Sequence, residues 1–132
     1  MGQENVDIVR RLLDAMERED LAAALACLDP DLEWIPLRAA TEGVYHGHAG
    51  FERFVADTNE NFEHFEPRFE LRDLGGRVLA WGTLNVRGTG SGVELQVPVG
   101  GIFDFRAGRI SRWQDFGSKE KAMEFAGQSP PD

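Results

Sequence analysis

The second half of the chain reads as a series of β-strands joined by glycine-rich turns, and this pattern limits the fold more than any other feature. Gly75-Gly76 lies between two of the strand-like segments and is a strong signal for a two-residue hairpin. Later glycines separate the remaining segments in a similar way. Short turns between consecutive strands predict a four-stranded antiparallel meander. Its strands are expected at 68–74, 77–87, 93–105 and 108–118.

Apolar residues in the rest of the chain recur mainly at helical spacing. Asp29-Pro30 should end the second helix, because a proline ring disfavours helical backbone before it. Ser118 is expected to cap a last helix, and Gly127 to end it. The expected helices before the meander are 4–18, 21–28 and 51–65, with a short strand at 32–37 and an irregular connection at 39–50.

These segments predict one α+β domain over residues 1–127 and a flexible tail at 128–132. The net charge of −9 argues against a nucleic-acid or anionic membrane partner, since phosphates need a basic surface. Cys27 is the single cysteine, so no intrachain disulfide is possible, and no apolar run is long enough to span a membrane. We therefore expect a cytoplasmic protein.

Strand alternation puts Trp113 and Asp115 on the same face of the last strand. An unpartnered carboxylate in a dry core is costly, so we expect this face to hold a mainly apolar pocket with Asp115 as its catalytic candidate. Asp115 could instead cap the helix at Ser118 or pair with Arg87, and Asn85 could pair with Asp115. Parity assigns to this face Phe69, Leu71, Trp81, Thr83, Asn85, Val97, Val99, Phe103, Trp113 and Asp115.

The helices are expected to cover this pocket face. The residues expected to bind a ligand in it, or to line its mouth, are Trp34, Tyr45, Phe54, Trp81, Thr83, Asn85, Val97, Phe103 and Trp113. The opposite face has an apolar centre that invites a second sheet, which predicts a homodimer through the outer sheet face. Its residues are Ala80, Leu84, Val86, Ile102, Ile110 and Phe116.

His46 and His48 are two residues apart and could in principle supply two metal ligands. A third ligand at a defined spacing is missing, so a partly exposed loop is the favoured interpretation. We expect no metal and no cofactor.

The order of helices, antiparallel sheet and a final strand ending in Trp-x-Asp-aromatic resembles the SnoaL-like branch of the nuclear transport factor 2-like superfamily. The segments GVYHGHAGFERFV and GGIFDFRAGRISRWQDFGS carry the likeness, which covers nearly the whole chain. The resemblance implies a cone-shaped fold in which helices close over a bent sheet and leave a deep pocket. It also implies a range of activities that includes polyketide cyclases, ketosteroid isomerases and limonene-epoxide hydrolases, so the fold is better determined than the function.

The segment ISRWQDF is similar to the final strand of limonene-epoxide hydrolases, and the resemblance gives Asp115 the role of the aspartate that moves a proton. The partners of that aspartate are not carried over, because Thr83 and Asn85 stand where the family has Arg and Asp. Trp34 and Pro36 replace its Tyr and Asn. The resulting hypothesis is a protein for small hydrophobic or polycyclic ligands, acting as a cyclase, isomerase or hydrolase through Asp115. The alternatives are a non-catalytic ligand-binding module and a protein-interaction module.

Overall fold

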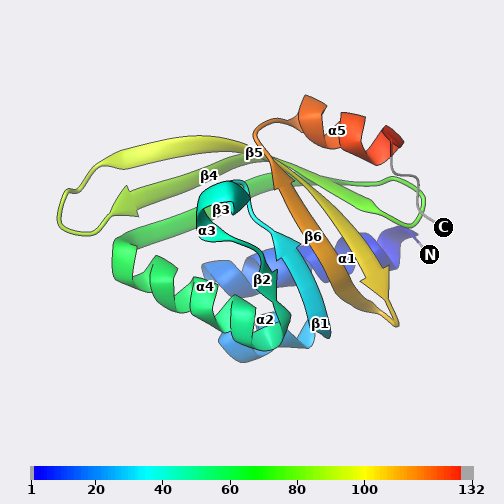
Figure 1. The fold of residues 1–132 in the computed structure, drawn as a ribbon, viewed down its shortest axis with the longest axis horizontal. Helices are drawn as coiled ribbons and strands as arrows, with labels where there is room; N and C mark the ends of the chain where they lie inside the picture. Colours follow the sequence, from blue (N-terminus) through cyan, green and yellow to red (C-terminus); the bar gives the residue numbers. More distant parts are fainter. Residues whose placement is uncertain (1, 129–132) are drawn as a thin grey trace.

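The computed structural model describes residues 2–128 of the chain, and it contains five helices and a six-stranded sheet in that range (Figure 1). The helices are α1 (Gly2–Glu17), α2 (Leu21–Ala26), α3 (Ala39–Glu42), α4 (Gly47–Asn61) and α5 (Lys119–Gln128). The strands are β1 (Leu28–Ile35), β2 (Tyr45–His46), β3 (Phe62–Asp73), β4 (Val78–Gly88), β5 (Glu94–Arg106) and β6 (Arg109–Phe116).

The strand order in the sheet is β2-β1-β6-β5-β4-β3. The last four strands in sequence pair antiparallel with their neighbours, which confirms the predicted meander. β1 joins the sheet beside β6 and runs parallel to it, with Trp34 opposite Trp113. This pairing makes the sheet mixed, and it brings two tryptophans that are far apart in sequence into direct contact.

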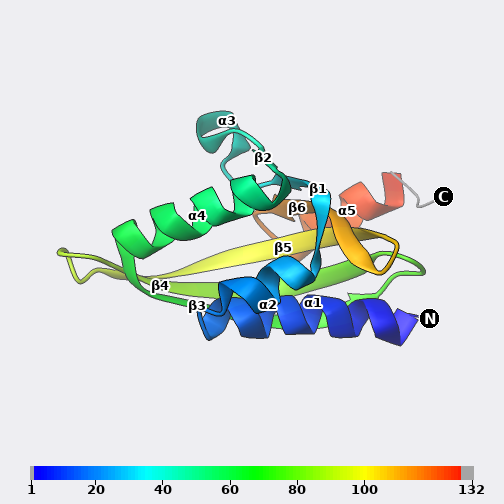
Figure 2. The same ribbon diagram turned by 90° about the horizontal axis from the view of Figure 1, so that it is seen from below.

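Helices cover both faces of the sheet, but unequally. α1, α2 and α4 lie on one face, called the inner face here, and α5 lies on the other (Figure 1). α1 and α2 run along one side of the inner face and α4 along the other side (Figure 2). Val9, Leu12 and Phe51 are completely buried against the inner face. The architecture is therefore the predicted α+β cone, with its main core on the inner face.

α5 packs against the outer face, and a buried arginine beneath it contributes to the contact. Gly100 leaves room for the start of α5, because a side chain at this position would collide with the Ser118 carbonyl. Arg77 is almost fully buried, pairs with Asp104 at 2.7 Å and lies over the Phe125 ring. The ion pair joins the residue before β4 to β5, and α5 is attached through the Phe125 ring and the apolar cluster around Ala122.

Several element boundaries differ from the predicted ones. The chain reaches the sheet at Leu28 instead of residue 32, because α2 already ends at Ala26. α4 starts at Gly47 and ends at Asn61, so Phe62 and Phe65 belong to β3. Helical spacing alone predicted that the helix would continue across these two residues. They belong instead to β3, an edge strand, where the missing N–H of Pro67 is tolerated. α3 and β2 interrupt the connection predicted at 39–50.

The predicted facing of β4 is wrong by one residue. The β4–β5 hairpin pairs Val97 with Leu84 and Gln96 with Asn85, so the even-numbered residues of β4 lie on the inner face. Trp81, Thr83 and Asn85 consequently lie on the outer face. A one-residue change in register moves every side chain of a strand to the other face, and the loop after Gly88 sets that register here.

The same correction removes most of the apolar surface predicted for a dimer. Ala80 and Ile110 belong to the inner core, and Leu84 and Val86 share the inner face with them by register. A β-bulge between Asp104 and Phe105 accounts for the inward position of Ile110. Ile102 and Phe116 do lie outward, but they pack in the cluster that includes α5 residue Ala122. The homodimer stays a prediction, without these residues as its interface.

None of the described helices is long and apolar enough to cross a membrane. α5 includes Gln128, one residue beyond the predicted domain end, and the rest of the predicted tail, 129–132, lies outside the described residues.

Candidate functional site

The carboxylate of Asp115 is held by two indole N–H groups. Trp34 Nε1 donates to Oδ2 at 3.0 Å, and Trp113 Nε1 donates to Oδ1 at 2.9 Å. The two indoles stack with their centroids 3.9 Å apart and their planes 8° from parallel. Strand geometry explains the arrangement, because Trp113 and Asp115 are two residues apart on β6 and Trp34 lies opposite Trp113 on β1.

Aromatic rings surround this pair of tryptophans. Phe54 of α4 makes an edge contact with Trp34 at 4.3 Å between centroids, and Tyr45 contacts it at 5.3 Å. Phe103 lies 5.1 Å from Trp113. Six of the ten predicted site residues are thus connected by direct contacts into one cluster on the inner face. They are Trp34, Tyr45, Phe54, Phe103, Trp113 and Asp115.

The environment of Asp115 favours the protonated acid more than water does. Burial of the carboxyl raises the pKa of Asp115 to about 6, and the charge of Glu42 acts in the same direction more weakly. The hydrogen bonds from Trp34 and Trp113 oppose the rise in pKa, since they stabilise the carboxylate. Among residues 2–128, none of the ion pairs includes Asp115. The group can therefore exist in both protonation states near neutral pH.

Sequence reasoning missed Glu42. Its carboxylate accepts a hydrogen bond from the Tyr45 hydroxyl at 2.7 Å, and Arg53 lies over the Tyr45 ring. Burial raises the pKa of Tyr45 to about 12, and the hydrogen bond to Glu42 adds to this rise. Tyr45 is therefore a neutral phenol fixed by α3. No motif marks Glu42, because its helix of four residues has no periodicity to read.

Gly101 keeps the backbone of β5 close to the Asp115 carboxylate. It lies directly opposite Asp115, and a Cβ at this position would be 3.2 Å from Oδ1 and 3.5 Å from the Phe103 ring. Such a contact is tight, so a larger residue would crowd the carboxylate. The signal available in the sequence was the Gly100-Gly101 pair in the middle of a strand, where glycine often marks a close approach.

In the described residues, Asp115 neither caps α5 nor pairs with Arg87, which were the two structural alternatives for it. Ser118 itself caps α5, because its hydroxyl accepts a hydrogen bond from the Lys121 N–H. Arg87 pairs with Glu63 and Glu94. Asn85 donates to Glu66 on the outer face and does not meet Asp115.

The other predicted ligand-binding residues divide between the two faces. Val97 is half-buried on the inner face. Trp81 lies on the outer face between two cations, with Lys119 Nζ 4.3 Å and Arg72 Cζ 5.1 Å from its ring. Thr83 lies on that face as well. Trp81 and Thr83, with Asn85, are therefore remote from the carboxylate they were expected to accompany.

Of the two histidines in the HGH segment, His48 makes a structural hydrogen bond and His46 is exposed. His48 Nε2 lies 2.8 Å from the Leu28 carbonyl oxygen, a geometry in which the ring N–H donates, and this bond fastens the start of α4 to β1. His46 is exposed and immediately precedes α4. Within the described residues, no group of three or more His, Cys, Asp or Glu side chains is arranged to hold a metal ion.

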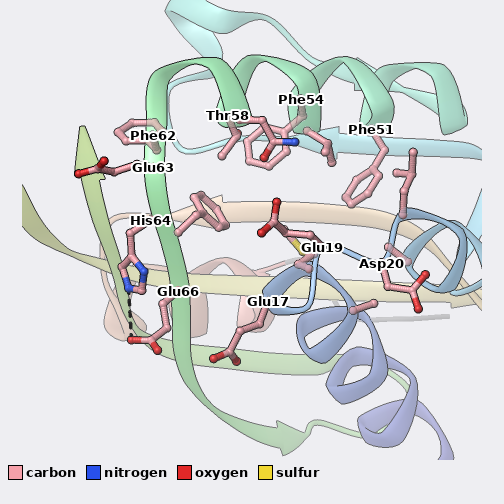
Figure 3. Close-up of a pocket in the computed structure, with 17 residues that line it drawn as sticks. Glu17, Glu19, Asp20, Phe51, Phe54, Thr58, Phe62, Glu63, His64 and Glu66 are labelled. Carbon is pink, nitrogen blue, oxygen red and sulfur yellow. Dashed lines mark ion pairs between the residues drawn. The ribbon is translucent and has the colours of Figure 1, made fainter. Parts of the chain in front are cut away.

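A cavity of about 460 Å³ lies between the end of α1, α4 and the first residues of β3 (Figure 3). The sequence predicted a pocket on this face of the sheet under the helices, but it predicted a different wall. Phe54 is the one predicted ligand-binding residue that lines this cavity, and Asp115 does not line it. Phe54 contacts Trp34 as well, so its ring lies between the cavity and the carboxylate cluster.

Trp34→Phe should raise the pKa of Asp115 further. The substitution keeps an aromatic ring but removes one of the two donors that stabilise the carboxylate. An infrared titration of the protonated carboxyl stretch, assigned by its loss in Asp115→Asn, checks this. Trp81→Phe is the matched control, because Trp81 lies on the outer face and should leave the midpoint unchanged. Equal midpoints in both variants would contradict the role given to the Trp34 N–H.

The chain belongs to the SnoaL-like domain family, whose model matches residues 9–113. The match covers most of the chain and ends two residues before Asp115. No curated protein matches this sequence significantly. The identification therefore rests on the family model and on the fold.

Solved structures confirm the nuclear transport factor 2-like fold. An NTF2-like protein of unknown function from Burkholderia pseudomallei is 23% identical with a TM-score of 0.78, covering 92% of this chain and 95% of that one. TerC, co-crystallised with polyporic acid, is 21% identical with a TM-score of 0.77, covering 92% and 96%. A candidate polyketide cyclase from Xanthomonas campestris is 23% identical with a TM-score of 0.75, covering 90% and 93%. At these identities the likeness establishes the fold alone.

Proposed function

We propose that this protein binds a small, mainly apolar molecule against the inner face of its sheet and that Asp115 exchanges a proton with it. The observation that carries the proposal is the carboxylate held between two indole N–H groups with no cationic partner among the described residues. A general base works best when its pKa lies near the working pH, and a value of about 6 meets this requirement.

The groups around Asp115 limit where its proton can come from. Indole N–H groups are donors only, so neither tryptophan can accept the proton of Asp115 or reprotonate a substrate. The Tyr45 hydroxyl donates to Glu42. A proton taken up by Asp115 therefore comes from water or from a bound molecule. The two tryptophans hold the carboxylate in position and take no part in the transfer of its proton.

The reaction class that fits best is removal of a proton next to a carbonyl group, the step shared by isomerases and aldol-type cyclases. Asp115 would take the C–H proton, the electron pair would pass to the carbonyl oxygen as an enolate, and the acid would return the proton to another atom. This step requires one carboxyl group. Epoxide hydrolysis, as the family resemblance describes it, requires an Arg and a second Asp, but Thr83 and Asn85 occupy those positions and lie on the outer face.

Flat, apolar molecules are the expected substrates. The cluster around Asp115 is built from rings, and ring faces favour hydrocarbon and aromatic partners. The co-crystallisation of TerC with polyporic acid supports a ligand of similar kind for this chain.

The test is proton exchange in a simple ketone. 2-Tetralone, a flat bicyclic ketone, should lose its α-protons to D2O faster in the presence of the protein, as followed by NMR. Asp115→Asn should abolish the acceleration, and Asp57→Asn, a change on the exposed surface of α4, should retain it. Binding of the ketone without accelerated exchange in the parent protein would favour the non-catalytic ligand-binding module instead.

A further inference from the structure

A cavity of about 460 Å³, in which a small molecule fits, lies apart from the Asp115 cluster. It lies where α1 ends and α2 begins, under α4 and beside β3, and its volume is within the range of small-molecule sites. Neither Asp115 nor the tryptophans that hold it line this cavity. Binding in this cavity therefore does not depend on proton transfer at Asp115.

The body of a ligand in this cavity would meet hydrocarbon. Four phenylalanine rings contribute to the wall, from both α4 and β3. Burial of a ring-sized apolar group against such a wall is favourable. The larger apolar residues that line it are Met16, Leu21, Phe51, Phe54, Val55, Phe62 and Phe65.

The charged groups at the cavity are almost all of one sign. Five carboxylates line it, whereas no lysine or arginine does, and His64 is the single lining residue that can become a cation. Three of the five are neutralised from outside, because Arg68 pairs with Glu17 and Glu66, and Arg87 lies 3.7 Å from Glu63. An anionic ligand is therefore disfavoured.

The remaining two carboxylates differ in what they already bind. Asp20 caps α2 through the Ala23 N–H and lies 3.4 Å from Arg18. Glu19 has no hydrogen bond or ion pair through its side chain in the described part of the chain. Its backbone is fixed in the left-handed region, at φ 58°, by the turn that closes α1 through the bond from Asp20 N to the Ala15 carbonyl. Figure 3 shows the Glu19 carboxylate extending from this turn toward the α4 side chains.

We propose that this cavity binds an amine carrying a ring-sized apolar group, with the rings of α4 and β3 around the hydrocarbon and the ammonium group beside Glu19. The Glu19 carboxylate favours a positively charged group, and the apolar wall favours the hydrocarbon part of the ligand. The nearby phenyl faces add to the preference, because a cation near an aromatic ring is attracted by it.

Calorimetric titration with three probes of one shape tests the proposal: 2-(1-naphthyl)ethylamine, the corresponding neutral alcohol and 1-naphthylacetate. The amine should bind roughly three- to tenfold more tightly than the alcohol, and the carboxylate more weakly than either. Glu19→Gln should remove the advantage of the amine and leave the alcohol unchanged. Glu124→Gln, an exposed change on α5, should preserve all three affinities.

The Asp115→Asn variant should retain the preference for the amine. This result would distinguish binding in the cavity from the proposed proton transfer at Asp115. Three results would overturn the proposal: equal affinities for amine and carboxylate, an amine advantage that persists in Glu19→Gln, or binding of none of the probes. None of these results bears on proton exchange at Asp115.

Discussion

Asp115→Asn should make the protein more stable than the parent at pH 8, by roughly 2 kcal/mol, and no more stable at pH 4. The parent keeps a carboxylate in a site that favours the neutral acid, whereas asparagine has no charge to lose. Urea unfolding of both proteins at the two pH values measures the difference.

The sign follows from the pKa of about 6 for Asp115 in the folded protein, above the ordinary value of 3.8. The folded state holds the proton more tightly than the unfolded chain does, so this group lowers stability as the pH rises from about 4 through 6. Two pKa units correspond to roughly 3 kcal/mol. Part of that gain is lost in the variant, because an amide NH2 cannot accept a hydrogen bond from the second indole.

Asp14→Asn is the matched control, because Asp14 is exposed on α1 and its replacement should change stability little at either pH. A lower stability of Asp115→Asn at both pH values, by the same amount, would mean that the carboxylate stabilises the fold. The role of Asp115 would then be structural.

Gly82→Ala should destabilise the fold by about 3 kcal/mol or more, the largest loss expected from adding one methyl group to this chain. Gly82 lies in the middle of β4 with φ 155°, a conformation that residues with a Cβ rarely adopt. A Cβ there would also collide with the backbone carbonyl of Arg68 on β3. Relief of the collision requires the β3–β4 pairing to open.

Gly90→Ala gives the comparison for Gly82. Gly90 also has a positive φ, but it lies in the exposed hairpin loop with nothing within 4 Å of an added Cβ. Its substitution should cost about 1 kcal/mol through conformation alone. Thermal and urea unfolding of the two variants should therefore differ clearly. A similar small loss in both would mean that β3 moves aside freely at Gly82.

Sequence patterns located the meander and the first helix because each carries a strong local signal. Gly75-Gly76 marks a hairpin, and the apolar stripe of α1 repeats over four turns. The pairing of Trp113 with Asp115 on one face needed strand alternation alone. The family resemblance then supplied the cone, which local pattern could not supply.

The features that the sequence did not determine depend on contacts between distant segments. The facing of Trp81 depends on the register of the β4–β5 hairpin, which is fixed by the geometry of its loop. Trp34 was expected in the pocket wall, but its hydrogen bond to Asp115 depends on β1 lying parallel to β6. Glu42 reaches Tyr45 from a single turn of helix. The cavity beside Glu19 forms where three elements meet.

The central claim is that Asp115 is a carboxyl group poised to take up and release a proton near neutral pH. A carbon-13 NMR titration of the aspartate side-chain carboxyl groups, with the Asp115 resonance assigned from Asp115→Asn, measures this directly. We expect a midpoint near pH 6. A midpoint at or below the ordinary value of 3.8 would contradict the claim, because the two indole N–H groups would then hold a permanent carboxylate.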